Sequence, residues 1–418
     1  MCAAVWTPRT AGVRASGQIY RGPAELSLRT ARPPIWLLMI ATVAPQLALT
    51  IYLPALPGIA AYFDVAYGTA QLTLSVYLLA FAFAQLAIGP LSDSVGRRPV
   101  LLGSLAVFVI SSVLCALSVS IEMLIGARLL QACGACGGAV LGRAIVRDSR
   151  AAQEAPSVMG YLTSASALAA ALSPLLGGQL LLVFDWRASF WLMAGFGVLV
   201  LVAAWVILAE TAPKLHASGR WLRTYLEGFR IVVRERRFVG LMIAATSAMA
   251  AFNIFFSAGP ILLIKVMGVS AALFGFFTLA WAGNFVIGSL MQARVQGIVK
   301  SIHLVAYGQL ILIAGALGMV VTALAGYVTP LALIIPLMVM GFGNGLNVPN
   351  AVANAMAVVP AAHAGAASAL LGFVQMLAAA ALTVLMGYLP HDTQFNIGLG
   401  IALVGLAGLA GWALLVRR

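Results

Sequence analysis

Cys133 and Cys136 are the first residues whose spacing could support chemistry, because two thiols three positions apart can form a redox pair or bind a metal. They lie inside an apolar stretch beside Gly134, Gly137 and Gly138. Small residues at such spacing let two helices approach closely in a membrane. No histidine or further cysteine stands near enough to complete a site. We therefore predict a packing role for this stretch, with no metal and no cofactor.

Arg128 lies within the same apolar stretch, about seven residues and hence ~10 Å from its outer end. A cation inside a membrane must face a water-filled cavity or a polar partner. Two interpretations remain open. Arg128 contacts a substrate or tunes a proton site in a cavity, or it hydrogen-bonds to backbone carbonyls of a bent helix.

Enzyme chemistry finds no support in the sequence. The apolar stretches contain no HExxH pattern, no serine–histidine pairing and no pair of acids, and the chain has no phosphate-binding loop. We therefore predict no catalytic residues, no enzyme activity and no direct use of ATP.

A short charged turn lies between two apolar stretches and contains Asp93, Arg97 and Arg98. Each charge would cost about 2.5–3.5 kcal/mol in hydrocarbon, so the turn is expected at a membrane face. The two arginines predict that this face is cytoplasmic. We expect the helices to break at the glycines and prolines of the turn, which are Gly89, Pro90, Gly96 and Pro99.

The elements that must position these residues are membrane-spanning helices. The chain of 418 residues is 62% hydrophobic and only 8% charged, which excludes an ordinary soluble domain. Its formal charge of +13 is explained by cytoplasmic loops and anionic lipid, so nucleic acid is not an expected partner. Continuous apolar runs predict an all-α polytopic fold with twelve spanning segments, at about 35–57, 69–88, 100–118, 121–145, 157–183, 188–209, 238–264, 272–293, 302–326, 330–354, 365–389 and 395–416.

The positive charges are distributed unevenly between the two sides of these segments. With the amino terminus in the cytoplasm, 21 of the 24 Lys and Arg residues fall in the tail, the inner loops and the carboxyl terminus. This bias predicts that both termini are cytoplasmic. The longest inner loop separates two sets of six segments, so the predicted divisions are a tail at 1–33, six-helix bundles at 34–209 and 238–418, and a linker at 210–237.

The linker itself allows two interpretations. Apolar and basic residues alternate from Trp221 to Phe238 in a pattern that suits an amphipathic helix on the inner membrane surface. A plain linker with a basic face fits equally well.

Several motifs together resemble a known family. The loop Gly89-xxx-Asp93-xx-Gly96-Arg97-Arg98-Pro99 resembles the signature loop of the major facilitator superfamily, and the stretch from Gly288 to Lys300 is a degenerate copy between segments 8 and 9. The stretch from Arg128 to Gly134 and Ser173-Pro174-Leu175-Leu176-Gly177-Gly178 resemble motifs of its proton-coupled antiporters. Tyr52-Leu53-Pro54, Pro349-Asn350-Ala351 and the stretch from Gly365 to Gly372 resemble its bicyclomycin and chloramphenicol resistance branch.

This resemblance implies two six-helix pseudo-repeats that expose one central cavity alternately to the two sides of the membrane. Charged pairs at the inner face and flexible helix positions then act as gates. The implied gating residues are Gly89, Asp93, Arg97, Arg98, Arg147, Asp148, Pro174, Gly177, Gly178, Asn347 and Asn350. The implied substrate-cavity residues are Gln46, Thr50, Gln71, Ser75, Arg128, Asn253, Asn284 and Gln375.

Thr50 marks a departure from this branch, in which an Asp commonly stands at that position. Amides and hydroxyls among aromatic residues suit a neutral or zwitterionic substrate, and Arg128 would also suit an anion. We expect a monomeric bacterial inner-membrane exporter of small organic molecules that is coupled to protons. The alternative is an importer or facilitator of a metabolite or siderophore.

Overall fold

The computed structural model describes residues 32–151, 153–212, 221–295, 298–360 and 363–416. Within these ranges every regular element is a helix, and twelve helical segments are long and apolar enough to cross a membrane. Because hydrocarbon offers no hydrogen-bond partners, long apolar runs fold as helices that satisfy their own backbone groups. The predicted tail at 1–33 lies almost entirely outside the described residues.

Each predicted segment coincides with one spanning helix, which confirms the expected all-α polytopic fold. The first span is divided into α1 (Ile35–Thr50), the 3₁₀ turn η1 (Leu53–Ala55) and α2 (Leu56–Tyr62), and the seventh into α9 (Arg236–Pro260) and the π-helical η2 (Ile261–Val266). The others are α3 (Tyr67–Val95), α4 (Arg97–Ala116), α5 (Ile121–Ser149), α6 (Ala155–Leu180), α7 (Arg187–Ile207), α10 (Ala271–Val295), α11 (Ser301–Leu324), α12 (Pro330–Ala357), α13 (Ala364–Gly387) and α14 (Phe395–Leu415).

The helix breaks predicted for the charged turn are wrong at three of four positions. Helix α3 continues through Gly89 and Pro90, and Pro99 lies in the first turn of α4, where its missing N–H would have had no helical partner. Neighbouring helices and serine hydroxyls can take up the backbone groups that a proline leaves free. Only Gly96 interrupts the helix, between α3 and α4. Its φ of 112° lies in a region that disfavours any residue with a Cβ.

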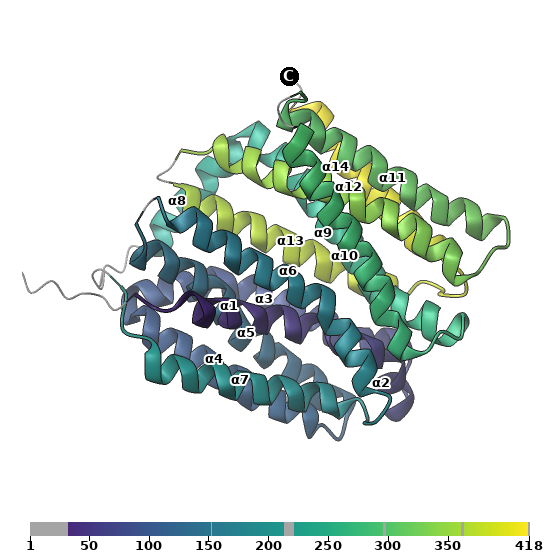
Figure 1. Ribbon diagram of the computed structural model, residues 1–418, viewed down its shortest axis with the longest axis horizontal. Helices are drawn as coiled ribbons and strands as arrows, with labels where there is room; N and C mark the ends of the chain where they lie inside the picture. The colour runs from purple at the N-terminus through teal and green to yellow at the C-terminus, as the bar shows by residue number, and fades with distance from the viewer. Residues whose placement is uncertain (1–31, 152, 213–220, 296–297, 361–362, 417–418) are drawn as a thin grey trace, which may run out of the picture.

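The spanning helices form two groups (Figure 1). Helices α1 and α3–α7 pack with one another, and so do α9–α14. Helix pairs α3–α13 and α6–α10 connect the two groups. Helices α2 and α8 (Trp221–Arg234) mark opposite ends of the bundle, which we call the Tyr67 end and the Arg97 end after residues that lie there.

Small residues allow close contact inside the first group. A Cβ added to Gly134 would overlap the backbone of Phe108 in α4, and one added to Gly138 would overlap the carbonyl of Ala41 in α1. Cys136 is buried and Cys133 partly buried in the same stretch of α5. This part of α5 therefore has the packing geometry expected from the sequence.

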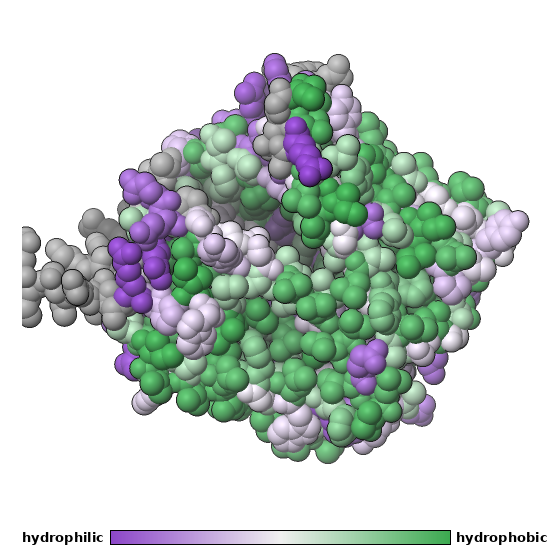
Figure 2. Space-filling model, viewed as in Figure 1, coloured by the Kyte–Doolittle hydropathy of each residue, from purple (hydrophilic) through white to green (hydrophobic). Residues whose placement is uncertain are grey.

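The linker contains a helix, α8, as one of its two interpretations predicted. Gly228 lies close to Ala366 of α13, and Val232 is buried against the second group. Figure 2 shows a mostly hydrophobic surface across the middle of the molecule, whereas its most hydrophilic residues gather toward the end where α8 lies. Such a surface suits a protein embedded in a bilayer.

Candidate functional site

The two groups of helices meet closely at the Tyr67 end, and α3 and α13 form the first contact. The backbones of Gly68 and Gly387 lie close together, because a Cβ on Gly68 would overlap the Gly387 carbonyl and one on Gly387 would lie 3.2 Å from the Gly68 Cα. The hydroxyl of Tyr67 donates to the carbonyl oxygen of Ser257 at 2.8 Å, and the Gln71 amide donates to the same oxygen. Gln71 is thus engaged with the opposite group of helices.

Helices α6 and α10 form the second contact at this end. A Cβ on Gly178 would overlap the carbonyl of Ala271, and one on Gly275 would overlap the backbone of Leu175. The Gln179 amide donates to a backbone carbonyl of α10 at 3.3 Å. We call the α3–α13 and α6–α10 contacts the two glycine seams. Together they hold the two groups against each other at the Tyr67 end.

Not every glycine of the predicted α6 gate serves this contact. A Cβ on Gly177 would overlap the carbonyl of Ile51 in the first group itself. Pro174 lies inside α6, which continues from Ala155 to Leu180. Gly177 therefore packs within one group, whereas its neighbour Gly178 packs between the two.

A cluster of ion pairs lies at the Arg97 end. The Arg97 guanidinium lies 2.6 Å from the Asp93 carboxylate and 2.8 Å from the Asp148 carboxylate, and it also donates to the Ser92 hydroxyl. Arg147 lies 3.8 Å from Asp148 and is mostly exposed. Four of the predicted gating residues are thus brought together, with all these ion pairs inside the first group of helices.

Glu210, which the sequence analysis missed, completes this cluster. Its carboxylate accepts hydrogen bonds from the backbone N–H groups of Arg97, Arg98, Thr211 and Ala212, two of which begin α4. Burial raises the pKa of this carboxyl, but the four N–H groups outweigh burial and hold its pKa below the usual range. The only sequence signal was an isolated acid directly after a spanning segment.

Arg128 is fully buried within the first group. Its guanidinium lies between the rings of Tyr52 and Tyr77, 4.3 Å from each centroid, and donates to the carbonyl oxygens of Ala48 and Thr73. Arg128 thereby connects α1, α3 and α5. This geometry agrees with the interpretation in which Arg128 hydrogen-bonds to backbone carbonyls. The contacts with the two tyrosine rings were not predicted.

Gln131 extends the Arg128 network one helical turn along α5. Its side-chain oxygen accepts from Arg128, and its amide donates to the Ser112 hydroxyl of α4 at 2.7 Å. In the described part of the chain no polar atom pairs with Nη2 of Arg128. One donor of a buried cation therefore remains available within the network.

The other predicted cavity residues differ in exposure. Gln46, Asn284 and Gln375 are partly exposed, whereas Thr50, Ser75 and Asn253 are buried. The hydroxyl of Thr50 donates to Gln46 O, and the amides of Asn253 and Asn284 donate to carbonyls four residues earlier in their own helices. Among these predicted residues, the side-chain amides of Gln46 and Gln375 are therefore the ones most accessible to a substrate.

Four aromatic rings on α9 and α10, which the sequence analysis did not name, form a cluster. Phe252 lies 4.1 Å from Phe256 and 4.4 Å from Trp281, measured between ring centroids, and Trp281 lies 5.5 Å from Phe285. Phe252, Trp281 and Phe285 are only partly buried. Their i, i+4 spacing within each helix was the available signal.

Asn347 and Asn350, predicted as gates, are both buried in α12. The Asn347 amide donates to the carbonyl of Ala244 in α9, and Asn350 donates to Leu346 in its own helix. Asn347 therefore links two helices of the second group.

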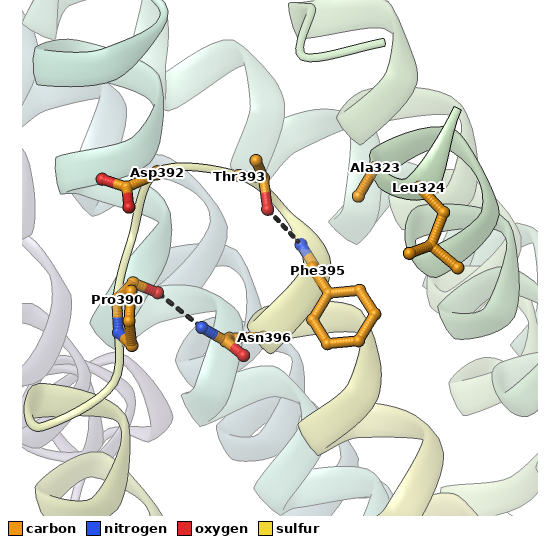
Figure 3. Close-up of a pocket in the computed structure, with 7 residues that line it drawn as sticks. All are labelled: Ala323, Leu324, Pro390, Asp392, Thr393, Phe395 and Asn396. Carbon is orange, nitrogen blue, oxygen red and sulfur yellow. Dashed lines mark hydrogen bonds between the residues drawn. The ribbon is translucent and has the colours of Figure 1, made fainter. Parts of the chain in front are cut away.

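A pocket of about 310 Å³ opens at the Tyr67 end, and none of the four seam glycines lines it. Figure 3 shows its lining, which comes from the end of α11, the loop before α14 and the first turn of α14: Ala323, Leu324, Pro390, Asp392, Thr393, Phe395 and Asn396. Asn396 donates to Pro390 O and the backbone N–H of Phe395 donates to Thr393, so local hydrogen bonds already occupy much of its polar surface. The pocket includes none of the predicted site residues.

Comparison with known proteins gives a consistent family. The profile described as Major Facilitator Superfamily matches residues 38–383. A chloramphenicol resistance protein of Pseudomonas aeruginosa is 34% identical over 317 residues, which is 75% of this chain and 72% of that protein. Multidrug resistance protein D of Escherichia coli K12 is 29% identical over 391 residues, covering 91% of this chain and 95% of its own.

Solved structures share the fold at low identity. A bacterial homolog of the human lysosomal transporter Spinster, in an inward-facing and unoccupied conformation, aligns with a TM-score of 0.68 at 16% identity, covering 91% of this chain and 94% of its own. A peptide transporter POT mutant aligns with a TM-score of 0.73 at 14% identity, covering 91% of this chain and 93% of its own.

Proposed function

Because this chain belongs to the major facilitator superfamily, it is a membrane transporter, and we propose that it exports small organic molecules across the bacterial inner membrane. The observation that carries the export direction is the 34% identity to a chloramphenicol resistance protein over three quarters of the chain. The half-buried rings of Phe252 and Trp281 support a substrate with an apolar or aromatic part.

The proposed orientation places the Arg97 end in the cytoplasm, with both chain termini on that side. The support is the concentration of Lys and Arg residues in the loops of that end. In this orientation the two glycine seams close the outer end, so the captured conformation would receive substrate from the cytoplasm.

Transport then requires the two six-helix bundles, residues 34–209 and 238–418, to rock about the central region as a monomer. The glycine seams separate at the outer end, and the Arg97 cluster comes into contact with the second bundle at the inner end. Asp93, Arg97, Arg98, Arg147 and Asp148 would exchange partners during this step.

Proton coupling of this export is the second part of the proposal. Thr50 provides no titratable group, and Arg128 is shielded by two tyrosine rings. This observation favours one alternative, an importer or facilitator of a metabolite or siderophore without a proton carrier in the first segment.

Reconstituted vesicles separate these functions. The flux of chloramphenicol is measured with and without an imposed pH gradient for wild type, Thr50→Asp and Arg128→Ala. We expect a gradient-dependent flux in wild type, a steeper pH dependence in Thr50→Asp and a lower flux in Arg128→Ala. An unfolding measurement on each variant distinguishes lost transport from lost folding.

Two results would overturn parts of the proposal. Equal chloramphenicol flux in protein-free and protein-containing vesicles contradicts export of this compound, and flux that ignores the pH gradient favours the facilitator. Unchanged flux in Arg128→Ala removes Arg128 from the transport pathway.

A further inference from the structure

An apolar groove runs along the outside of the first group of helices, between α4 and α7. Its volume is about 490 Å³, and it is lined by Leu102, Gly103, Ala106, Leu201, Val202 and Trp205. We call it the α4–α7 groove. Gly103, Val202 and Trp205 are exposed, so in a membrane this groove faces lipid.

The groove exists because two of its residues are small. A Cβ added to Gly103 would meet no heavy atom within 4 Å, which is open space on the surface of a packed helix. Ala106, one turn further along α4, continues the same depression. A glycine in a helix interior costs roughly 1 kcal/mol relative to alanine, so the depression is maintained against helix propensity.

A lone positive charge stands at the mouth of the groove. The Arg98 guanidinium lies over the Trp205 ring, 5.9 Å from its centroid, and donates to the Trp205 carbonyl at 2.9 Å. Within the described ranges no carboxylate lies within ion-pair distance of this guanidinium, and its Nε has no partner. The nearby Glu210 carboxylate instead accepts four backbone N–H bonds.

The positions of these residues match the depth of a lipid. Arg98 is the second residue of α4 and Trp205 lies close to the end of α7, where head groups and interfacial tryptophans meet. From Arg98 to Ala106 the groove descends ~12 Å toward the bilayer centre, close to the ~15 Å depth of one hydrocarbon leaflet. A charged mouth above an apolar channel is complementary to one phosphate and one acyl chain.

We propose that the α4–α7 groove binds an anionic phospholipid, whose phosphate pairs with Arg98 and whose acyl chain lies over Gly103 and Ala106. This lipid would neutralise the arginine that follows Arg97 of the ion-pair cluster. The groove lies on the outer side of α4 and α7 and shares only Arg98 with the proposed gate, and lipid binding to it is measured without transport. It therefore holds or fails independently of the transport direction.

Trp205 provides a direct reporter of occupancy. The protein is placed in phosphatidylcholine vesicles containing increasing fractions of phosphatidylglycerol with brominated acyl chains, which quench nearby tryptophans. The quenching that Trp205→Phe loses relative to wild type is the signal of the groove. We expect this component to saturate at a low fraction of phosphatidylglycerol.

Two variants test the two parts of the site. Gly103→Leu fills the groove without a steric clash and is expected to raise the half-saturating lipid fraction about tenfold, the equivalent of roughly two buried methylene groups. Arg98→Gln should raise it about fivefold for phosphatidylglycerol, as expected for one basic residue near an anionic surface. Gly195→Leu on α7, also in open space, and Arg294→Gln, an exposed arginine, serve as matched controls.

Four outcomes would overturn the proposal. The first is the same half-saturating lipid fraction in wild type and Gly103→Leu. The second is an increase of this fraction in Gly195→Leu as large as that in Gly103→Leu. The third is equal quenching by brominated phosphatidylcholine, which would mean that the groove holds acyl chains without selecting for charge. A cross-linked dimer through position 202 that excludes lipid would assign the groove to a second copy of the chain instead.

Discussion

The guanidinium of Arg128 obtains its stabilisation from backbone carbonyls and aromatic rings. Two tyrosine rings at 4.3 Å and the carbonyls of Ala48 and Thr73 surround it, and none of these groups is a carboxylate. A carboxylate partner would add a second buried charge with its own desolvation cost. The arrangement therefore keeps a cation inside the bundle with few polar side chains.

Replacing Arg128 with lysine should destabilise the protein although the charge is kept. A lysine ammonium cannot reach two rings and two carbonyls at once, so we expect the free energy of unfolding to fall by about 2–3 kcal/mol. Cys115 and Cys136 are buried, and a thiol-reactive dye reports their exposure during heating. Arg147→Lys, at a mostly exposed arginine, is the control. An unchanged unfolding temperature in Arg128→Lys would contradict this role.

The sequence predicted that Arg128 needs partners and offered backbone carbonyls as one possibility, but it did not predict the tyrosine rings. An arginine in an apolar stretch stands out, whereas Tyr52, just after α1, and Tyr77 on α3 also fit an ordinary apolar core. Glu210 was missed for a related reason. Its role depends on α7 ending beside the start of α4, which no local pattern specifies.

Helices α3, α6, α10 and α13 meet through glycines placed near their ends at the Tyr67 end. Gly68 lies at the start of α3 and Gly387 at the end of α13, and Gly275 and Gly178 lie near the corresponding ends of α10 and α6. The two seams thus pair the beginning of one helix with the end of another. Backbone contact at both seams lets the ends close without interdigitated side chains.

Adding one methyl group at a seam should open this end. In Gly178→Ala the new Cβ overlaps the Ala271 carbonyl, so we expect the open population to rise about tenfold, the equivalent of ~1.4 kcal/mol of overpacking. Spin labels at the exposed positions Val119 and Tyr327 report the distance between the groups at this end. Gly160→Ala lies on the same helix in open space and should leave the distance distribution unchanged. A wild-type distribution in Gly178→Ala would exclude the seam as a closing contact.

The sequence was most informative about the positions of the spanning helices. Apolar length located all twelve spanning helices, because hydrocarbon thickness sets that length directly, although α3 extends seven residues beyond its predicted end at residue 88. Prolines were less reliable guides, since α3 continues through Pro90. Gly177 and Gly178 read alike in sequence, yet one packs within its group and the other between groups.

The whole molecule is closed at one end, and a histidine lies at that closure. The ring of His391, in the loop before α14, lies 5.6 Å from the ring of Tyr67 on α3. Burial lowers the pKa of His391, and the neighbouring Asp392 opposes this effect only in part. The closed end therefore favours the neutral imidazole.

Acidification should consequently loosen this end. The closed contact is fully stabilised above the usual histidine pKa of about 6.5, and stability is lost as the pH falls through that value toward the lowered pKa of His391. Hydrogen exchange at 67–71 and 388–394, corrected for the intrinsic pH effect, should be faster at pH 5.5 than at pH 7.5. His391→Asn should abolish the difference, and His303→Asn, at the other end, should keep it. A pH response that survives in His391→Asn would contradict this assignment.

The conformation was beyond the reach of the sequence, because one sequence must populate both the closed and the open form of the same end. The number of spanning helices follows from composition and hydrophobic length. Which gate is shut depends on small free-energy differences between two packed arrangements.

Backbone atoms form much of the two glycine seams, so closure at this end depends little on which side chains lie nearby. Residues that we propose to face the cargo, such as Trp281 and Gln46, are not part of the seams, so replacing them would leave the closing contact unchanged. A Cβ at a seam glycine such as Gly178 would instead overlap the backbone across the contact. Changes in the transported compound and preservation of the glycine seams therefore involve different positions of the chain. A family of pumps with divergent cargoes can be drawn from one scaffold on that basis.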